Sequence, residues 1–473
     1  MIKFGTGGWR AIIGDEFTKA NIQILARAMC EKMKHEGQDK KGIVIGYDRR
    51  FLSKEAMQWA GCVFAAEGIT AYLVNRSAPT PLIMYYVKEH ALPYGLMVTA
   101  SHNPALYNGI KVFTAGGRDA DEGQTADIER YLRTFESAGA EHIHEMRYED
   151  GVAAGLIREI YPLNEYLDYV LEAVDVQAIR NAGLRVAIDP MYGVSETSLM
   201  TILHTARCEV FPIHDRHDTL FGGKLPAPTA DTLRPLENTV IDKGCDIGIA
   251  TDGDADRIGV VDDTGRFLHP NDILVLLYYY MVKYRGETGP VVRNLSTTHM
   301  LDRVAAGFGE ECIETPVGFK HISAAMTKDN AVLGGESSGG LTVRGHISGK
   351  DGIYAAGLLV EMIAVTGRKL SEIMSDIESE YGRIYMEERS YRFTSEKKEE
   401  MSSILLERRL VPELPYPVDH VSYMDGCKVY FENGGWVSAR FSGTEPLLRI
   451  FCEMPGNKQA VEVCRLYEQW LGL

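Results

Sequence analysis

A pattern of alternating strands and helices recurs three times between residues 40 and 365, and it constrains the fold more than any other feature. Apolar strands such as GIVIGYD at 42–48 alternate with helical runs such as SKEAMQWAGCVFAAEG. The pattern restarts at LRVAIDP (184–190) and again at GPVVRNL (289–295). Such alternation predicts a sheet covered by helices, so we expect three diverged copies of one α/β unit.

Each copy ends its third strand in an unusual loop. The three loops are TASHNP (99–104), TDGDADR (251–257) and GGESSGG (334–340). In open α/β sheets, ligands bind outside the carboxyl ends of the strands. Three such loops therefore predict one shared cleft.

The C-terminal part has a different pattern. Residues 427–454 are typical of a small meander with ENGG as a turn, and a helix, NKQAVEVCRLYEQWL, follows. The stretch before the meander, at about 370–400, is charge-rich (MEERSYRFTSEKKEE) and is predicted to be a solvated connection. We expect three tandem α/β domains of related topology with mixed sheets, plus a smaller C-terminal α+β domain, around a central cleft. The predicted domains are 1–150, 151–262, 263–375 and 376–473.

Composition excludes several classes of partner. The chain has 50 Lys and Arg against 66 Asp and Glu, a net charge of −16, and no long basic run, which argues against nucleic acid and anionic membranes. The longest apolar run, ILVLLYYYMV at 273–282, is too short to cross a bilayer, and no signal peptide is evident. Eight scattered cysteines without a CxxC pair favour reduced thiols, so we predict a cytoplasmic protein.

The TDGDADR loop predicts a divalent metal site. Asp252, Asp254 and Asp256 repel one another unless a cation neutralises them. An EF-hand is excluded because its sixth and twelfth positions are Arg257 and Asp263 here. An acidic turn in water is the alternative. Three carboxylates leave the shell incomplete, and a phosphate oxygen would complete it well for Mg²⁺.

Two further loops have the composition of ligand contacts. RFSGTEPLLR (440–449) combines an arginine fork, hydroxyls and a glycine, which suits an anion, although a polar hairpin looks similar. GGESSGG offers Glu336 and Ser338 to a hydroxyl-rich ligand, with a flexible surface turn as the alternative.

The TASHNP loop supplies a candidate carrier of the phosphate. If the metal lacks an oxygen ligand, Ser101 is suited to carry a phosphoryl group whose oxygen completes the shell. Lys111, on the following strand NGIKVF, is placed to act as a cation, and a solvated strand lysine is the alternative.

Four motifs in this order resemble a known family, the α-D-phosphohexomutases, which include phosphoglucomutase and phosphomannomutase. The motifs are TASHNP, DGDADR, GGESSGG and RFSGTEP, and FGTGGWRA, GYDRR, IDPMYG and TPVGFK support them. The resemblance covers essentially the whole chain. It implies three α/β domains that carry the phosphoserine, metal and sugar loops, and a fourth domain that carries a phosphate loop.

The resemblance also implies roles for individual residues. Ser101 corresponds to the phosphorylated serine, and its phosphate joins Asp252, Asp254 and Asp256 as ligands of Mg²⁺. The implied contacts of the transferring phosphoryl group are Arg10, Lys111 and Arg257. The implied substrate contacts are His102, Glu336, Ser338, Arg440, Ser442, Gly443, Thr444 and Arg449.

The implied reaction converts hexose 1-phosphate to hexose 6-phosphate through a phosphoserine and a hexose 1,6-bisphosphate, which also acts as activator. One departure matters, because Gly340 stands where many bacterial members have the histidine of GEMSGH. His346 and Lys350 instead resemble the HIxxKDG segment of glucose-type members, so the general base stays open between Lys111, His346 and Lys350. We expect glucose as the substrate, then mannose, then glucosamine, and a monomer or homodimer.

Three other activities are alternatives. A Mg²⁺-dependent phosphatase would use Asp252 as its nucleophile, but it would need neither TASHNP nor a second phosphate loop. A sugar-phosphate sensor would be expected to have lost the serine or an aspartate. A hexose 1,6-bisphosphate synthase shares the same chemistry and stays open.

Overall fold

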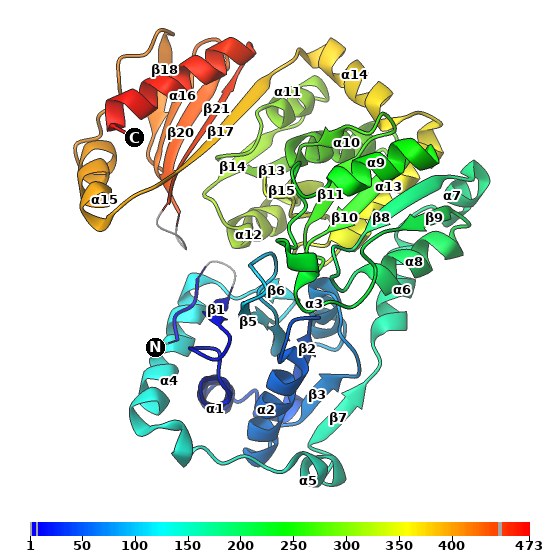
Figure 1. The fold of residues 1–473 in the computed structure, drawn as a ribbon, viewed down its shortest axis with the longest axis vertical. Helices are drawn as coiled ribbons and strands as arrows, with labels where there is room; N and C mark the ends of the chain where they lie inside the picture. Colours follow the sequence, from blue (N-terminus) through cyan, green and yellow to red (C-terminus); the bar gives the residue numbers. More distant parts are fainter. Residues whose placement is uncertain (1, 6–7, 443–446) are drawn as a thin grey trace. The chain divides into compact units, whose positions relative to one another are not determined.

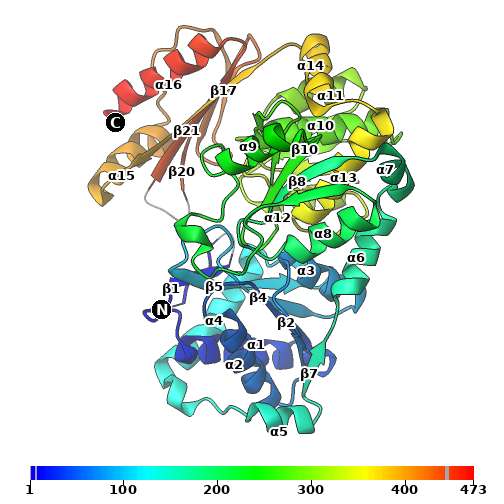
Figure 2. The ribbon, with the colours of Figure 1, turned by 45° about the vertical axis from the view of Figure 1, so that its right-hand side comes forward.

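The structure is a computed structural model that describes residues 2–5, 8–442 and 447–473. It divides into two compact units, Met1–Ile273 with Ser338–Ser371, and Leu274–Ser337 with Glu372–Leu473. Figures 1 and 2 show the helices and strands, coloured along the sequence. The predicted class is confirmed: three tandem α/β regions with their own sheets precede a smaller C-terminal domain. Among the described helices, none is both long enough and apolar enough to cross a membrane.

The first sheet of the first unit is mixed. Its strand order is β1-β5-β4-β2-β3-β7, with β6 beside β5, and β4, β2, β3 and β7 run parallel. Every residue of β2 and β4 is buried, which fits continuous apolar strands covered on both faces. The strands are β1 Trp9–Ile12, β2 Ile43–Tyr47, β3 Ala71–Val74, β4 Tyr94–Val98, β5 Tyr107–Thr114, β6 Arg118–Asp119 and β7 Ile157–Ile160. The helices are α1 Lys19–His35, α2 Ser53–Ala66, α3 Thr80–Glu89, α4 Glu122–Ala138 and α5 Tyr148–Ala153.

The second sheet of this unit has the order β12-β11-β10-β8-β9. Strands β10, β8 and β9 are parallel, while β11 and β12 are antiparallel to their neighbours. Helix α13 packs on β10 and β11. The elements are α6 Leu163–Glu172, α7 Val176–Ala182, β8 Arg185–Asp189, α8 Glu196–Thr205, β9 Glu209–Pro212, α9 Arg234–Lys243, β10 Ile247–Thr251, β11 Ile258–Val261, β12 Phe267–Leu268, β16 Leu341–Val343 and α13 Gly352–Thr366.

The second unit begins with a parallel α/β region. Strand β13 lies between β14 and β15 and is parallel to both. Helix α12 packs on all three strands. The elements are α10 Pro270–Lys283, which spans the division between the units, β13 Val291–Asn294, α11 Met300–Gly307, β14 Cys312–Thr315, α12 Phe319–Asp329, β15 Leu333–Gly335 and α14 Leu370–Tyr381.

The C-terminal sheet is antiparallel, with the order β17-β21-β20-β19-β18. Helix α16 lies on one face of it (Figure 1), because Ala460, Val463, Cys464 and Tyr467 form one buried stripe at helical spacing. The elements are β17 Tyr385–Arg392, α15 Ser395–Ser402, β18 Val418–Ser422, β19 Cys427–Phe431, β20 Trp436–Phe441, β21 Leu447–Met454 and α16 Asn457–Leu471.

The prediction of a solvated connection at about 370–400 is wrong, because helix α14, strand β17 and helix α15 occupy most of this segment. Strand β17 pairs with β21 along its whole length. It is an edge strand whose outer side chains are exposed, so charged residues are tolerated there. The domain boundaries stay predictions, although the first sheet includes β7, which lies beyond residue 150.

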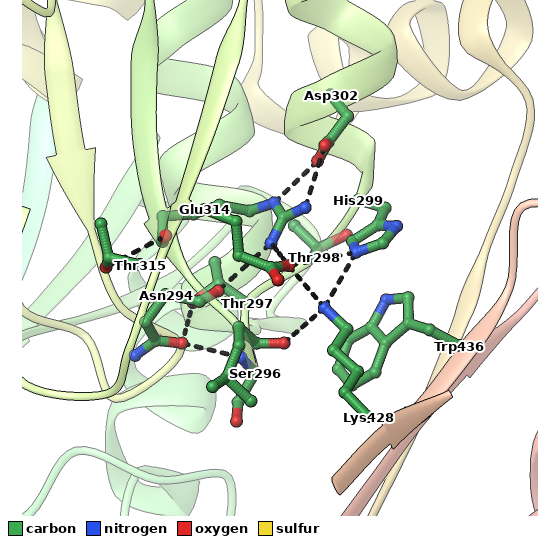
Figure 3. A network of polar contacts seen from close by, with 12 residues as sticks. Asn294, Ser296, Thr297, Thr298, His299, Asp302, Glu314, Thr315, Lys428 and Trp436 are labelled. Atoms are coloured by element: carbon green, nitrogen blue, oxygen red, sulfur yellow. Dashed lines mark hydrogen bonds and ion pairs between the residues drawn. The ribbon is translucent and has the colours of Figure 1, made fainter. Parts of the chain in front are cut away.

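A partly buried cluster of charges joins the C-terminal sheet to β13 and β14 within the second unit (Figure 3). Arg293 on β13 donates to Asp302 Oδ2 at 2.7 Å and to Glu314 Oε2 at 2.6 Å. Lys428 on β19 donates to the same Glu314 atom at 2.7 Å, and its Nζ lies 3.0 Å from His299 Nε2. We call these five residues the Arg293 cluster.

Candidate active site

Three aspartates, here called the aspartate group, follow β10 in the first unit. Asp252, Asp254 and Asp256 are buried, and one ligand atom from each lies within 4.8 Å of the others. The Oδ1 atoms of Asp254 and Asp256 have no hydrogen-bond donor among the described residues. Buried carboxylate oxygens without donors are costly unless a cation meets them, so the aspartate group fits a divalent metal.

Two lysines contact the aspartate group. Lys111 Nζ, on β5, donates to Asp254 Oδ2 at 2.6 Å and to Asp256 Oδ2 at 2.7 Å. Lys350 Nζ lies 3.0 Å from the same Asp256 oxygen. Burial alone would lower the pKa of Lys111, but Asp254 and Asp256 raise it above its ordinary value. Lys111 therefore keeps its proton and acts as a buried cation.

Ser101 contacts the aspartate group directly. Its Oγ donates to Asp252 Oδ2 at 2.7 Å, and the Nδ1 atom of His102 lies 3.3 Å from the same Oγ. Burial, with the nearby Asp254 and Asp256, raises the pKa of Asp252 to about 8. Ser101 has a φ of 50°, an uncommon conformation for a residue with a side chain. A serine held in this way at the end of β4 presents its hydroxyl to the carboxylates.

The strained serine loop is held by Arg50, which the sequence did not single out. Arg50 Nη2 donates to the carbonyl oxygens of Ser101 and Asn103 at 2.6 Å each, and its Nη1 donates to those of Pro104 and Tyr107 at 2.9 Å each. The GYDRR motif carried the available signal, since it places two arginines just after a buried strand. We interpret Arg50 as the residue that fixes the conformation of this loop.

Positive charge is concentrated around Ser101. Arg10 Nη1 donates to Asn103 Oδ1 at 2.5 Å, and Arg257 Nε lies 4.0 Å from Asp256 Oδ1. Burial and the neighbouring Arg257 lower the pKa of Arg10. Arg257 and burial lower the pKa of His102 well below its ordinary value. An environment that disfavours further positive charge is suited to an anion such as phosphate.

The two residues of the HIxxKDG segment have different surroundings. Lys350 reaches the aspartate group, and its side chain covers Gly340, where a Cβ would lie 2.2 Å from Lys350 Cδ. His346 Nε2 instead lies 2.7 Å from Asp351 Oδ2, and its ring stacks on Tyr354 at 4.1 Å between centroids. The histidine expected at position 340 in other members would therefore displace Lys350.

The second unit holds three of the predicted substrate contacts, Glu336, Arg440 and Arg449. Glu336 is buried, and its Oε1 accepts from Asn294 Nδ2 and from Gly318 N at 3.1 Å each. Arg440 on β20 and Arg449 on β21 are directly opposed across the sheet. Like charges in such positions destabilise a sheet, so an anion beside them would be favourable.

The remaining predicted contacts give less information. Ser442 N donates to Leu447 O at 2.8 Å, which closes the end of the β20–β21 pairing. Gly443 and Thr444 lie outside the described residues. Ser338 is exposed and belongs to the first unit.

The chain matches four domain families along its length. They are the phosphoglucomutase/phosphomannomutase alpha/beta/alpha domains I (1–138), II (164–265) and III (269–381), and the C-terminal domain (408–466). A Thermococcus kodakarensis protein named phosphoglucomutase/phosphomannomutase is 29% identical over 473 residues, covering 98% of this chain and 97% of the relative. A Methanothermobacter thermautotrophicus protein named as a probable phosphoglucosamine mutase is 30% identical over 462 residues, covering 97% and 95%.

Solved structures agree with these matches. A candidate phosphomannomutase from Thermus thermophilus has 28% identity and a TM-score of 0.85, covering 100% of this chain and 99% of that chain. An Aspergillus fumigatus N-acetylphosphoglucosamine mutase, solved with GlcNAc-6P and magnesium, shares the fold alone, at 13% identity and a TM-score of 0.57 over 100% and 96% of the two chains. The fold and the matches define an isomerase that transfers a phosphoryl group within its substrate. The chain belongs to the phosphoglucomutase/phosphomannomutase family of these enzymes.

Proposed function

We propose that this enzyme interconverts hexose 1-phosphate and hexose 6-phosphate, with glucose preferred and mannose next. The reaction uses a phosphorylated Ser101 and a hexose 1,6-bisphosphate that is both intermediate and activator. The 2.7 Å hydrogen bond from Ser101 to Asp252 carries the proposal, because it joins a hydroxyl to the aspartate group, in which two buried carboxylate oxygens lack donors. Mg²⁺ held by the aspartate group would neutralise charge on the transferring phosphoryl group.

The chain's own residues divide the remaining work. The bond between phosphorus and Ser101 Oγ breaks as the bond to a sugar hydroxyl oxygen forms. Lys111, Arg10 and Arg257 stabilise the negative charge of the group in transfer. The bisphosphate then turns end for end and returns its other phosphoryl group to Ser101.

The sugar hydroxyl has to lose a proton, and its acceptor stays open between Lys350 and His346. Lys350 contacts Asp256, whereas the contacts of His346 are with Asp351 and aromatic rings. The raised pKa of Lys111 makes that residue a cation and a poor proton acceptor. We assign Glu336 and Ser338 to sugar hydroxyls, and Arg440 and Arg449 to the other phosphate.

A second candidate is phosphoglucosamine mutase. The relative with 30% identity carries that name, and it matches nearly the whole chain. Comparing kcat/KM for the 1-phosphates of glucose, mannose and glucosamine separates the two candidates. A glucosamine value above both others would replace our sugar assignment and leave the phosphoserine chemistry untouched.

The test of the reaction couples product formation from glucose 1-phosphate to glucose-6-phosphate dehydrogenase, with Mg²⁺ and a trace of glucose 1,6-bisphosphate. Ser101→Ala should remove most turnover, and Ser137→Ala, on the exposed side of α4, is the matched control. No turnover of any hexose phosphate by the wild type would reject the proposal. Free phosphate that depends on Asp252 but not on Ser101 would indicate a phosphatase.

A further inference from the structure

Two neighbouring backbone amides in the second unit donate to carboxylates from distant parts of the sequence. Gly318 N donates to Glu336 Oε1 at 3.1 Å, and Val317 N donates to Asp425 Oδ2 at 3.0 Å. The same Asp425 oxygen accepts from Arg440 Nε at 2.8 Å. The Val317–Gly318 amide pair thus links the carboxylate assigned to sugar hydroxyls with the guanidinium assigned to phosphate.

The backbone at the amide pair is tightly constrained. Gly318 has a φ of 129°, where residues with a side chain are strained. Pro316 fixes its own φ directly before the pair, and α12 begins directly after it at Phe319. Because both flanks are constrained, the two N–H groups keep fixed directions.

Glu336 is held from a second side as well. Asn294 Nδ2 donates to the same Glu336 oxygen, and Asn294 Oδ1 accepts from Thr297 Oγ1 at 2.9 Å (Figure 3). The Thr297 hydroxyl oxygen in turn accepts from Ser337 N at 3.1 Å. These contacts fix both the Glu336 side chain and the start of the loop that follows it.

We propose that Asp425 is a positioning residue for the mutase reaction, an inference that rests on the proposed function. Asp425 holds the Arg440 guanidinium at a set place relative to Glu336 through the Val317–Gly318 amide pair. Glu336 and Arg440 are then already aligned with each other when a hexose phosphate binds. Without Asp425, Arg440 adopts other rotamers in the free enzyme, and ordering it again weakens substrate binding more than it slows chemistry.

Two substitutions of Asp425 separate its contacts. Asp425→Ala removes both, whereas Asp425→Asn loses the charge but keeps an acceptor for Val317 N. We expect Asp425→Ala to raise KM for glucose 1-phosphate about tenfold and to change kcat by less than about threefold, with Asp425→Asn in between. Asp419→Asn is the matched control, because Asp419 is an exposed aspartate on β18 that pairs with His420. An unchanged KM in Asp425→Ala, or equal losses in KM and kcat with a lower thermal midpoint, would overturn the inference.

Hydrogen–deuterium exchange tests the link without turnover. In Asp425→Ala, peptides containing Val317–Gly318 and peptides containing Glu336 should both exchange faster than in the wild type, and Asp419→Asn should leave both unchanged. Faster exchange at Val317 with no change around Glu336 would contradict the link. A wild type that turns over no hexose phosphate would instead reject the proposed function, and the exchange result would still report the link itself.

Discussion

The aspartate group of the first unit is buried and the Arg293 cluster of the second is partly buried, and the two differ in how completely their charged side chains are paired. In the aspartate group, the Oδ1 atoms of Asp254 and Asp256 lack donors although two lysines are in contact. Among the described residues, every buried side-chain nitrogen and oxygen atom of the Arg293 cluster has a hydrogen-bond partner. Buried polar atoms without hydrogen-bond partners indicate a site for a ligand. A fully paired cluster indicates a contact that holds structural elements together, which we call a structural joint.

Replacing one aspartate of the group should have the largest effect, and the effect should fall on activity. Asp254→Asn removes a metal-binding charge, so kcat should fall about a hundredfold to a thousandfold. Mg²⁺ should raise the thermal midpoint of the wild type and not that of the variant. Coupled turnover and thermal scans with and without EDTA measure both effects, with exposed Asp231→Asn as control. Wild-type turnover in Asp254→Asn would mean that the unpaired oxygens bind no ligand.

Breaking the Arg293 cluster should act on stability. Lys428→Met removes a buried cation that contacts Glu314, and this loss should destabilise the second unit by about 3–5 kcal/mol. Adding Glu314→Gln to this variant should recover part of the loss, because the stranded charge is then gone. Thermal and urea midpoints measure the effect, and Lys458→Met, at an exposed position of α16, is the control. If Lys428→Met and the control unfold alike, the cluster is no structural joint.

The loops at strand ends were predictable, and the structural joint was not. TASHNP and DGDADR each follow an apolar strand, which predicted that Ser101 and Asp252 lie at strand ends, and a hydrogen bond joins them. Strand CKVYF alternates its faces, so the sequence shows that Lys428 and Tyr430 share a face. It does not show that Glu314, more than a hundred residues away, covers that face.

The local sequence also did not predict contacts in which the partner of a side chain lies outside its own motif. His346 and Lys350 share one short segment, yet only Lys350 contacts the aspartate group. Arg50 was quoted within GYDRR without a role, because its four acceptors are backbone carbonyls, which have no sequence signature. The charges of β17 predicted solvent, since an edge strand and a solvated connection have similar composition.

The pH dependence of stability gives a smaller test of the Arg293 cluster. Burial, with help from Arg293, lowers the pKa of His299 to about 3. Below a pH of about 6.5, His299 binds a proton in the unfolded chain but not in the folded protein. The free energy of unfolding therefore falls on acidification by up to about 1.4 kcal/mol per pH unit. His299→Gln should flatten this decline in thermal midpoints between pH 6.5 and 4, whereas His142→Gln, on an exposed side chain, should not. An unchanged slope would show that another group carries the acid sensitivity.

The smallest expected effect concerns the contact between Lys350 and the aspartate group. A Cβ at Gly340 would lie 2.2 Å from Lys350 Cδ and 2.8 Å from its Cγ, so Gly340→Ala should push the lysine away from Asp256. We expect kcat/KM to fall about threefold to tenfold, since one charged contact is weakened while the fold is kept. Lys350→Met removes the same contact outright, and a coupled assay of both single variants and the double variant compares them. If Gly340 acts through Lys350, the double variant loses no more than Lys350→Met alone, and additive losses would show that Gly340 has a separate role.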